Sequence, residues 1–460
     1  MQYQLKILSP LHIGCGEEYN GLSYLADKGK LFYFEPDRIF AAIGQKEALR
    51  FATWIAEKSR ELEVAEQRIK REKEYNKKKH LKDEKKKLLR EFTLKKYLQN
   101  LRFNFTELLS RATYEVTAPS NFWADQTIIP CIKQAARPYV PGSEIKGAIR
   151  TAVLYTRLLN DASLQEFLEA ELKKFLADSQ TDIKQVANQQ RPDRRQKTKL
   201  NKAVARIEGS FQAKALRTKN DAKFDLLKFL AVGDSELLDS VVSIKVASSK
   251  PVNVSRPFTI NYEYLKPDLM LSLPGTGLED EKSRKVKLAK MAADGEARFK
   301  DTVENFLACC HAFASDLLQT EKEYFRLQGK TGVVAHLSEI EKQNTPDSPV
   351  LRIGKDEGFF SLTMGMAIKK LWPDLYKNAL IHATTGKSYD DQHGGLLPKT
   401  RKLVQWANNT ELTAGWVKLM PPGTHNRETP QKKAETRKSK ESNSPLDVSS
   451  LLEKFGKKGR

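Results

Sequence analysis

Residues 138–150 read Pro-Tyr-Val-Pro-Gly-Ser-Glu-Ile-Lys-Gly-Ala-Ile-Arg, and this stretch decides the fold. A Pro-Gly turn precedes Ser143, whose side chain can cap the free backbone N–H groups at the start of a helix. From Ile145 onward, apolar residues recur at i, i+3, i+4, i+7 and i+8, so one face of that helix packs against a core. The sequence therefore predicts an amphipathic helix from Ser143 to about Leu159.

The same helix carries two cations that point to a negatively charged ligand. Lys146 and Arg150 lie four residues apart, so both side chains project from one face, next to a helix N-terminus that attracts anions. Gly147 costs about 1 kcal/mol relative to alanine inside a helix, so we expect another backbone or a nucleic-acid strand to approach closely there. On local pattern alone, two solvated cations on an ordinary helix are the favoured interpretation, and a phosphate site is the alternative.

The chain is strongly basic, with 79 Lys and Arg against 58 Asp and Glu in 460 residues, and its formal net charge is +21. Such a balance indicates a polyanionic partner or an acidic surface and says nothing about the fold. The excess is concentrated, because residues 57–96 hold 16 basic against 9 acidic residues, residues 178–223 hold 12 against 5, and residues 425–460 hold 10 against 5. The remainder is nearly neutral and would hold a polyanion through a few placed cations.

The four cysteines, at positions 15, 131, 309 and 310, form no CxxC pair and no zinc-ligand spacing. Such sparse use suits a reducing cytoplasm and predicts no disulfide framework. The N-terminus enters a strand-like segment without the charged and apolar regions of a signal peptide. The most apolar helical stretch, residues 303–318, is interrupted by polar and charged side chains, so no membrane span is expected. We expect a cytoplasmic protein without metal or cofactor.

Strand-like and helical segments follow one another irregularly, without a βαβα repeat. This pattern predicts an α+β fold with antiparallel sheets and inserted helical segments. A Glu/Lys-rich insert at about 57–110 is expected to form a projecting helical hairpin, and a polar, arginine-rich run at about 178–223 to form a basic loop. The segments that alternate like strands are 2–8, 22–25, 30–34, 112–117, 127–133, 240–247, 258–264 and 415–420.

Tyr139–Arg150 resembles the signature segment of the RAMP superfamily of CRISPR-associated proteins. Leu8–Gly16 resembles the end of the superfamily's first strand and the glycine turn after it. Leu351–Ser361 resembles its second glycine-rich loop, and Gly415–Lys418 resembles a closing strand. In order and spacing, the four segments are most similar to one family, the subunit of type III-A effector complexes that caps the guide-RNA 3′ end of the filament.

The resemblance implies two ferredoxin-like, RRM-related domains in tandem, residues 1–250 and 251–424, followed by a basic, disordered tail at 425–460. It also implies a non-catalytic guide-RNA-binding subunit of a CRISPR interference complex, acting in guide RNA 3′-end maturation and antiviral defence. The expected partners are guide RNA (crRNA), the backbone RAMP subunits of the complex and host nucleases that trim the guide.

Glycines and cations of the two loops and the helix are the predicted RNA-binding residues. Glycine lets backbone N–H groups approach phosphate oxygens as small anion-binding nests, while lysine and arginine supply charge. Glu144, Asp356 and Glu357 run against this hypothesis, because they place negative charge beside the loops. The hypothesis requires that positively charged side chains at two glycine-punctuated bends lie close enough together in the folded chain to hold one ribose-phosphate strand, and that the bends do not point into the interior. The predicted set is His12, Gly14, Gly16, Ser143, Lys146, Gly147, Arg150, Arg352, Gly354, Lys355 and Gly358.

Two alternatives stay open. His12 lies beside the first glycine turn, where guide-processing endoribonucleases of the RAMP superfamily can present a general base, so it could serve metal-independent RNA cleavage. Such cleavage also needs an acid and cationic stabilisation, and a packing role for this histidine is favoured. The second alternative is a protein-docking scaffold whose basic helical inserts recruit nucleases or neighbouring subunits.

Overall fold

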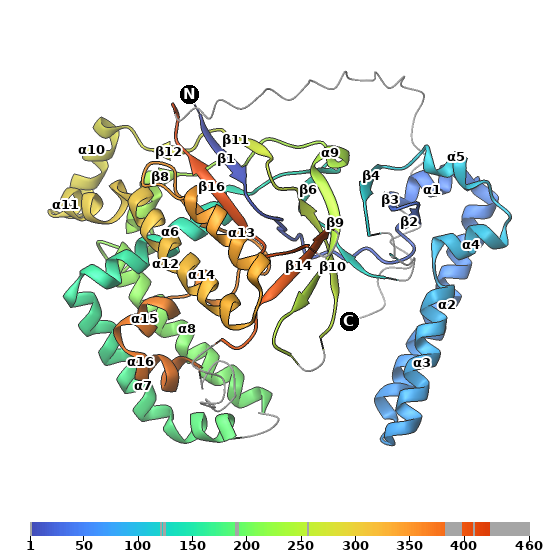
Figure 1. Cartoon of the computed structure of the whole chain (residues 1–460), viewed down its shortest axis with the longest axis horizontal. Coiled ribbons are helices and arrows are strands. Elements are labelled where there is room, and N and C mark those ends of the chain that lie inside the picture. Colours follow the sequence, from blue (N-terminus) through green and yellow to red (C-terminus); the bar gives the residue numbers. More distant parts are fainter. Residues whose placement is uncertain are drawn as a thin grey trace. The chain divides into compact units, whose positions relative to one another are not determined.

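The computed structural model describes residues 2–119, 122, 126–188, 193–254, 257–381, 398–407 and 410–423. Two main β-sheets organise these residues, one of four strands and one of eight, and helices pack beside them (Figure 1). Most strand pairs are antiparallel, so the predicted α+β fold class is confirmed. Within the described ranges, no helix combines the length and the apolar character that crossing a membrane requires.

The four-stranded sheet has the order β11-β1-β16-β13 and joins strands from both ends of the chain. Leu5 of β1 stands opposite Leu271 on one side and Leu419 on the other, and all three side chains are fully buried. Alternate residues of β1 thus face the core, as the strand pattern predicts. The strands are β1 (Tyr3–Ile7), β11 (Met270–Leu273), β13 (Val350–Arg352) and β16 (Trp416–Met420).

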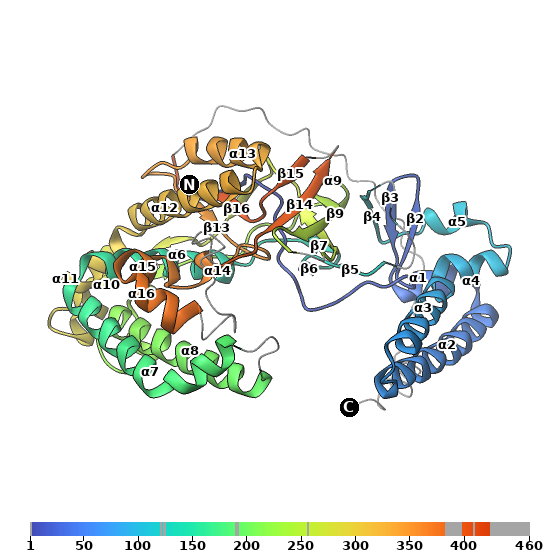
Figure 2. The same ribbon diagram turned by 60° about the horizontal axis from the view of Figure 1, so that its bottom comes forward.

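Helices α6 (Gly142–Asn160) and α12 (Phe306–Leu327) pack against each other and against β13 (Figure 2). The buried face of α6 includes Ile145 and Ile149, four residues apart. The amphipathic helix predicted from the signature segment is therefore confirmed, and its apolar face fixes the start of α6 beside the four-stranded sheet.

The eight-stranded sheet runs β15-β14-β9-β4-β3-β2, with β10 joined to β9 and β5 joined to β10. β9 holds the sheet together, because it pairs antiparallel with β10 and with β14 and meets β4 in a parallel bridge. The strands are β2 (Tyr24–Asp27), β3 (Lys30–Tyr33), β4 (Tyr114–Thr117), β5 (Ile128–Ile129), β9 (Ile244–Pro251), β10 (Ile260–Leu265), β14 (Lys402–Ala407) and β15 (Thr410–Leu412).

Isolated bridges fasten the segment after β1 to its neighbours in space. Leu11 pairs with Leu265 at the end of β10, and Gly14 pairs with Cys131. The first glycine-rich bend is thus anchored to residues more than 100 positions later in the chain. Two short antiparallel pairs lie outside the main sheets. β6 (Lys133–Gln134) pairs with β7 (Arg137–Pro138), and β8 (Leu230–Ala231) pairs with β12 (Gly277–Leu278).

Helices occupy the predicted insert at about 57–110 and extend beyond it toward the N-terminus. Their inner faces form a small core that includes Phe34, Phe51, Leu94 and Leu98. The helices are α1 (Pro36–Ile43), α2 (Gln45–Arg71), α3 (Tyr75–Glu91), α4 (Leu94–Asn100) and α5 (Phe105–Leu109).

The basic loop predicted at about 178–223 is largely helical instead. Helix α8 (Arg194–Leu216) packs against α7 (Ala162–Asn188) through Leu200, Val204 and Phe211, which lie on one buried face. With Ile207 these residues recur at i, i+4, i+7 and i+11, a helical period that the basic composition of the run concealed. The loop prediction is therefore wrong for residues 178–188 and 194–216.

The remaining helices are short, and most of them follow β8. The predicted boundary at residue 250 falls inside β9, and strands from both sides of it pair in both main sheets. The predicted tail, 425–460, lies outside the described residues. The helices are η1 (Ala222–Phe224), η2 (Leu226–Phe229), α9 (Ser240–Ser243), α10 (Glu281–Met291), α11 (Gly295–Phe299), η3 (Lys300–Glu304), α13 (Thr331–Lys342), α14 (Phe359–Leu362), α15 (Gly365–Leu371), α16 (Pro373–Leu375) and η4 (Tyr376–Ile381).

Candidate nucleic-acid interface

The two glycine-rich bends lie against each other. We call residues 9–16 the first glycine loop and residues 353–358 the second. The N–H of Lys355 donates to the carbonyl oxygen of His12 at 2.8 Å. Gly354 has a φ of +80°, and a Cβ there would lie 2.4 Å from the same oxygen, so only glycine fits. The backbones of the two bends therefore meet in the folded chain, whereas Arg352, a cation of the second bend, is buried.

A cavity of about 370 Å³ opens where the loops meet, and we call it the glycine pocket. The first turn of α6 reaches it through Glu144, so all three segments singled out by the sequence converge on one hollow. Its lining consists of Ile13, Gly14, Glu144, Gly354, Lys355, Asp356, Glu357, Gly358, Leu362 and Lys402.

The second glycine loop offers backbone donors to this pocket. Gly354, Asp356 and Gly358 have φ values of +80°, +67° and +86°, so every second residue adopts the left-handed conformation. Such alternation makes successive N–H groups converge, which is how backbone nests bind anions. Within the described residues, the N–H groups of Asp356, Glu357 and Gly358 have no hydrogen-bond acceptor. The loop therefore has free donors where an anion could sit.

Two of the three acidic residues in the pocket are less repulsive to an anion than the sequence suggests. The Asp356 carboxylate, 2% exposed, pairs with Lys402 at 2.8 Å and accepts the hydroxyl hydrogen of Ser249 at 2.6 Å. Burial raises the pKa of Glu357 to about 8, and nearby Glu144 adds to the effect while Arg352 opposes it. Glu357 is thus mostly a neutral carboxylic acid at pH 7 and can donate a hydrogen bond.

Among the predicted cations, Lys355 remains exposed at the pocket, and its ammonium has no partner among the described residues. Lys402, which the sequence analysis missed, also lines the pocket from β14. No local pattern marks Lys402, since its partner Asp356 lies 46 residues earlier in the chain. Within the described ranges, no group of three or more His, Cys, Asp or Glu side chains is placed to hold a metal ion.

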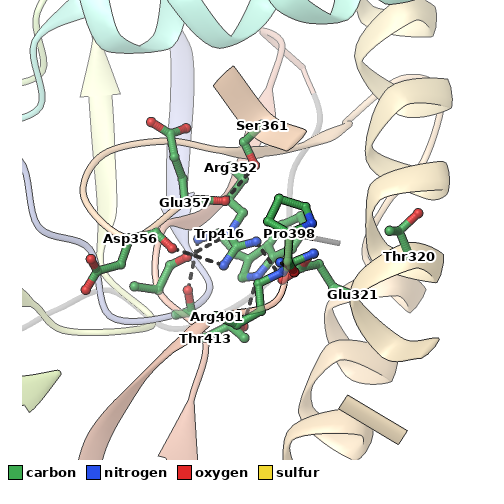
Figure 3. A network of polar contacts seen from close by, with 12 residues as sticks. Thr320, Glu321, Arg352, Asp356, Glu357, Ser361, Pro398, Arg401, Thr413 and Trp416 are labelled. Atoms are coloured by element: carbon green, nitrogen blue, oxygen red, sulfur yellow. Dashed lines mark hydrogen bonds and ion pairs between the residues drawn. The ribbon is translucent and has the colours of Figure 1, made fainter. Parts of the chain in front are cut away.

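Arg352 has a different place from the one predicted (Figure 3). Its guanidinium is buried, pairs with Glu321 at 3.0 Å and donates to the carbonyl oxygen of Asp356 at 3.3 Å. Arg401 pairs with the other oxygen of Glu321 at 2.6 Å. Burial favours a raised pKa for Glu321, but the two arginines hold it below its usual value. Arg352 is therefore not free for phosphate; it holds the second glycine loop in shape.

Lys146 and Arg150 do share one face of α6, but both already have partners. Lys146 donates to the carbonyl oxygen of Leu230 at 2.8 Å, and Arg150 pairs with Asp225 at 2.8 Å. Neither side chain lines the glycine pocket. In this structure the two cations fasten α6 to residues 225–230, and their contact with phosphate stays a prediction.

The close contact with another backbone segment, predicted at Gly147, occurs instead at Gly142. A Cβ on Gly147 would meet nothing within 4 Å, whereas a Cβ on Gly142 would lie 2.2 Å from the carbonyl oxygen of Val232. Ser143 does not cap the helix, because the N–H of Gly142 donates to the Asp234 carboxylate at 2.8 Å. The Ser143 cap is therefore wrong, and no described segment of the protein approaches Gly147, where a nucleic-acid strand stays a prediction.

His12 is 1% exposed and forms part of the packing between the sheets. Its Nδ1 donates to the carbonyl oxygen of Glu263 at 2.7 Å, and its ring lies 4.7 Å from that of Tyr262. Burial lowers the pKa of His12 to about 4, so the ring is neutral at pH 7. Of the two first-loop glycines, Gly14 lines the pocket, and Gly16 does not.

The neighbour of His12, Glu263, was not anticipated. It is fully buried, pairs with Lys133 and accepts the phenolic hydrogen of Tyr114 at 2.7 Å. These partners lie more than 100 residues from Glu263 in the sequence, so no local spacing could have revealed them. The cluster supports the first glycine loop from beneath and does not line the pocket.

No family model matches the chain, and no curated protein matches it either. Two solved structures are similar to it over almost its whole length. One is a chain of the cryo-EM structure of a Csm-crRNA-target RNA ternary complex in a type III-A CRISPR-Cas system, with 18% identity and a TM-score of 0.56 over 91% of this chain and 99% of that chain. The other is the crystal structure of T. onnurineus Csm5, with 19% identity and a TM-score of 0.55 over 90% and 99%. The chain has the fold of these two proteins.

Proposed function

We propose that this chain is a non-catalytic guide-RNA-binding subunit of a type III-A CRISPR effector complex, working in the cytoplasm. In this proposal it caps the filament end that holds the 3′ portion of the guide. The observation that carries it is the convergence of both glycine loops and the first turn of α6 on one pocket with free backbone donors. The fold shared with a Csm-crRNA-target RNA complex chain and with Csm5 supports the same assignment.

The pocket suits a phosphate of the RNA backbone. Free N–H groups of the second glycine loop would donate to phosphate oxygens, and the ammonium of Lys355 would supply charge at the rim. The protonated carboxyl of Glu357 adds a further donor at neutral pH. None of these groups reads a base edge, so binding would depend on phosphate position and be similar for different sequences.

The role of the subunit would be geometric. A cap that holds the last guide nucleotides ends the stack of backbone RAMP subunits and limits how far host nucleases can trim the 3′ end. This gives the chain a part in guide maturation and antiviral defence without chemistry of its own. The burial and low pKa of His12 support the non-catalytic part, because a general base must reach the 2′-hydroxyl.

Fluorescence anisotropy with labelled guide RNA and the full chain tests the binding site. Lys355→Glu should weaken binding about 5- to 30-fold, as expected for losing a charged contact and adding repulsion. Lys290→Glu is a control with the same charge change at an exposed position of α10 outside the pocket. Equal losses in both variants would mean that only net charge matters and would count against the pocket.

Incubation of the chain with repeat RNA in EDTA tests the non-catalytic part. We expect no cleavage over hours. Cleavage that disappears in His12→Ala would instead identify a metal-independent endoribonuclease, even if the anisotropy results still support RNA binding at the pocket.

A further inference from the structure

The hairpin of α2 and α3 is packed less completely than the rest of the described chain. The two helices run side by side in both views, joined at residues 72–74 (Figures 1 and 2). None of the 17 residues of α3 is buried. A helix gains most of its stability in a protein from burying an apolar face, so α3 has apolar surface that still lacks a cover.

That surface borders a groove between the helices, with a volume of about 410 Å³. Its floor is aliphatic, with Val64 and Ala65 from α2 and Leu81 and Leu88 from α3. Val64 is 47% exposed, which is unusual for a valine that has apolar neighbours. The groove is within the size range of sites that bind ligands or protein side chains.

Two arginines flank this floor along α2. Arg60 and Arg68 are exposed, line the groove and have no partner among the described residues. They are eight residues apart, or about 12 Å along the helix axis. The lining also carries two carboxylates, of which Glu61 pairs with Lys58 at 2.8 Å and Glu84 lies 3.6 Å from His80. The groove is therefore apolar in the middle, and its charged groups without a partner among the described residues are the two arginines.

We propose that this groove docks an amphipathic helix of a partner protein, with an apolar stripe over Val64 and Leu81 and with acidic residues two turns apart that pair with Arg60 and Arg68. A helix lying in an apolar groove is a common mode of protein recognition, and charge complementarity fixes its register. The proposal stands independently of the glycine pocket, which draws its lining from other segments.

RNA is the weaker candidate for this groove. Bases bind to proteins mainly by stacking on aromatic rings, and the groove lining has no aromatic residue. Lysines that could follow a phosphate backbone, such as Lys79 and Lys86, are on α3 but do not line the groove. An aliphatic floor between two arginines matches a helix with leucines and glutamates better.

The test uses synthetic 18-residue helical peptides and the full chain, measured by isothermal titration calorimetry. The first peptide has a leucine stripe flanked by two glutamates seven residues apart, and two others have glutamine or lysine at those positions. We expect the glutamate peptide to bind at least 10-fold more tightly than the glutamine peptide. Arg60→Glu/Arg68→Glu should abolish that binding and allow the lysine peptide to bind instead.

The matched control is Lys79→Glu/Lys86→Glu, which makes the same charge change at exposed positions of α3 outside the groove lining. Circular dichroism verifies that both double variants keep their helix content. We expect the control to bind the glutamate peptide within threefold of the unaltered chain. Equal loss in both variants, absence of the charge-swap rescue, or displacement of the peptide by poly(U) RNA would overturn the proposal.

Discussion

Around the glycine pocket, Arg352 and Lys402 are each held by a carboxylate, whereas on α2 Arg60 and Arg68 face solvent without a partner among the described residues. The first region uses these cations to fix a loop whose backbone N–H groups are proposed to bind phosphate. The second has cations that are themselves exposed. Charge counted along the sequence therefore locates the exposed helical segments well and the proposed phosphate-binding loop poorly.

The largest expected effect comes from removing the buried carboxylate of Glu321, beside the glycine pocket. Glu321→Gln leaves Arg352 and Arg401 buried without an anion, so the free energy of unfolding should fall by about 3–5 kcal/mol. Glu61→Gln removes an exposed pair with Lys58 on α2 and should cost less than about 1 kcal/mol. Urea denaturation followed by circular dichroism measures both. Similar losses would show that the buried network is not what stabilises the second glycine loop.

A second prediction compares two glycines with opposite surroundings. Gly354→Ala places a Cβ against the carbonyl oxygen of His12 in a left-handed conformation, and it should cost about 2 kcal/mol or more of stability. Gly147→Ala meets open space inside a helix and should stabilise the chain by up to about 1 kcal/mol. Thermal unfolding gives the sign of each stability change directly. A loss of stability in Gly147→Ala would indicate a contact absent from this structure.

A third prediction concerns pH. The pKa of Glu357 is raised from 4.5 to about 8, so the native chain keeps a proton that the unfolded chain releases between these values. The free energy of unfolding should therefore fall as pH rises from 4.5 to 8. Glu357→Gln removes this slope and should be more stable than the unaltered chain at pH 9, by on the order of 1–3 kcal/mol, with little difference at pH 4. If the free energies of unfolding of the two proteins change in parallel with pH, the raised pKa of Glu357 is refuted.

The smallest expected effect is a change in the salt dependence of RNA binding, which should differ between the two regions. In titrations of guide RNA binding against salt, Lys355→Ala should reduce the log-log slope by about 0.7, the value for one phosphate contact on a single strand. Lys79→Ala on α3 should leave the slope unchanged, because the pocket alone is proposed to hold RNA. A larger change of slope in Lys79→Ala than in Lys355→Ala would indicate that RNA binds to the hairpin of α2 and α3 instead.

The sequence located the main parts of the fold and of the site through local patterns. The apolar period after Ile145 gave α6, and the glycine bends near Gly14 and Gly354 gave the two loops that meet. The roles of single cations could not be predicted in this way. Arg352 pairs with Glu321 and Lys402 with Asp356, across 31 and 46 residues, and such pairs depend on the fold.

Helix α8 was missed for a related reason. Its buried residues Leu200, Val204, Ile207 and Phe211 follow a helical period that could have been read from the sequence, but the many basic residues between them favoured a loop. In the structure, α7 packs against α8. Similarly, Gly142 needs its small size because of Val232, ninety residues later, so the close contact could be predicted for the helix but not for the right glycine.

The place of β1 between β11 and β16 has a consequence for biosynthesis. Residues 3–7 leave the ribosome more than 400 residues before the stretch 416–420, which is one of their two pairing partners. Throughout translation this apolar strand lacks a neighbour on one edge, and pairing so distant in sequence is slow to form. The nascent polypeptide should consequently depend on chaperones or on early assembly to keep that edge from aggregating.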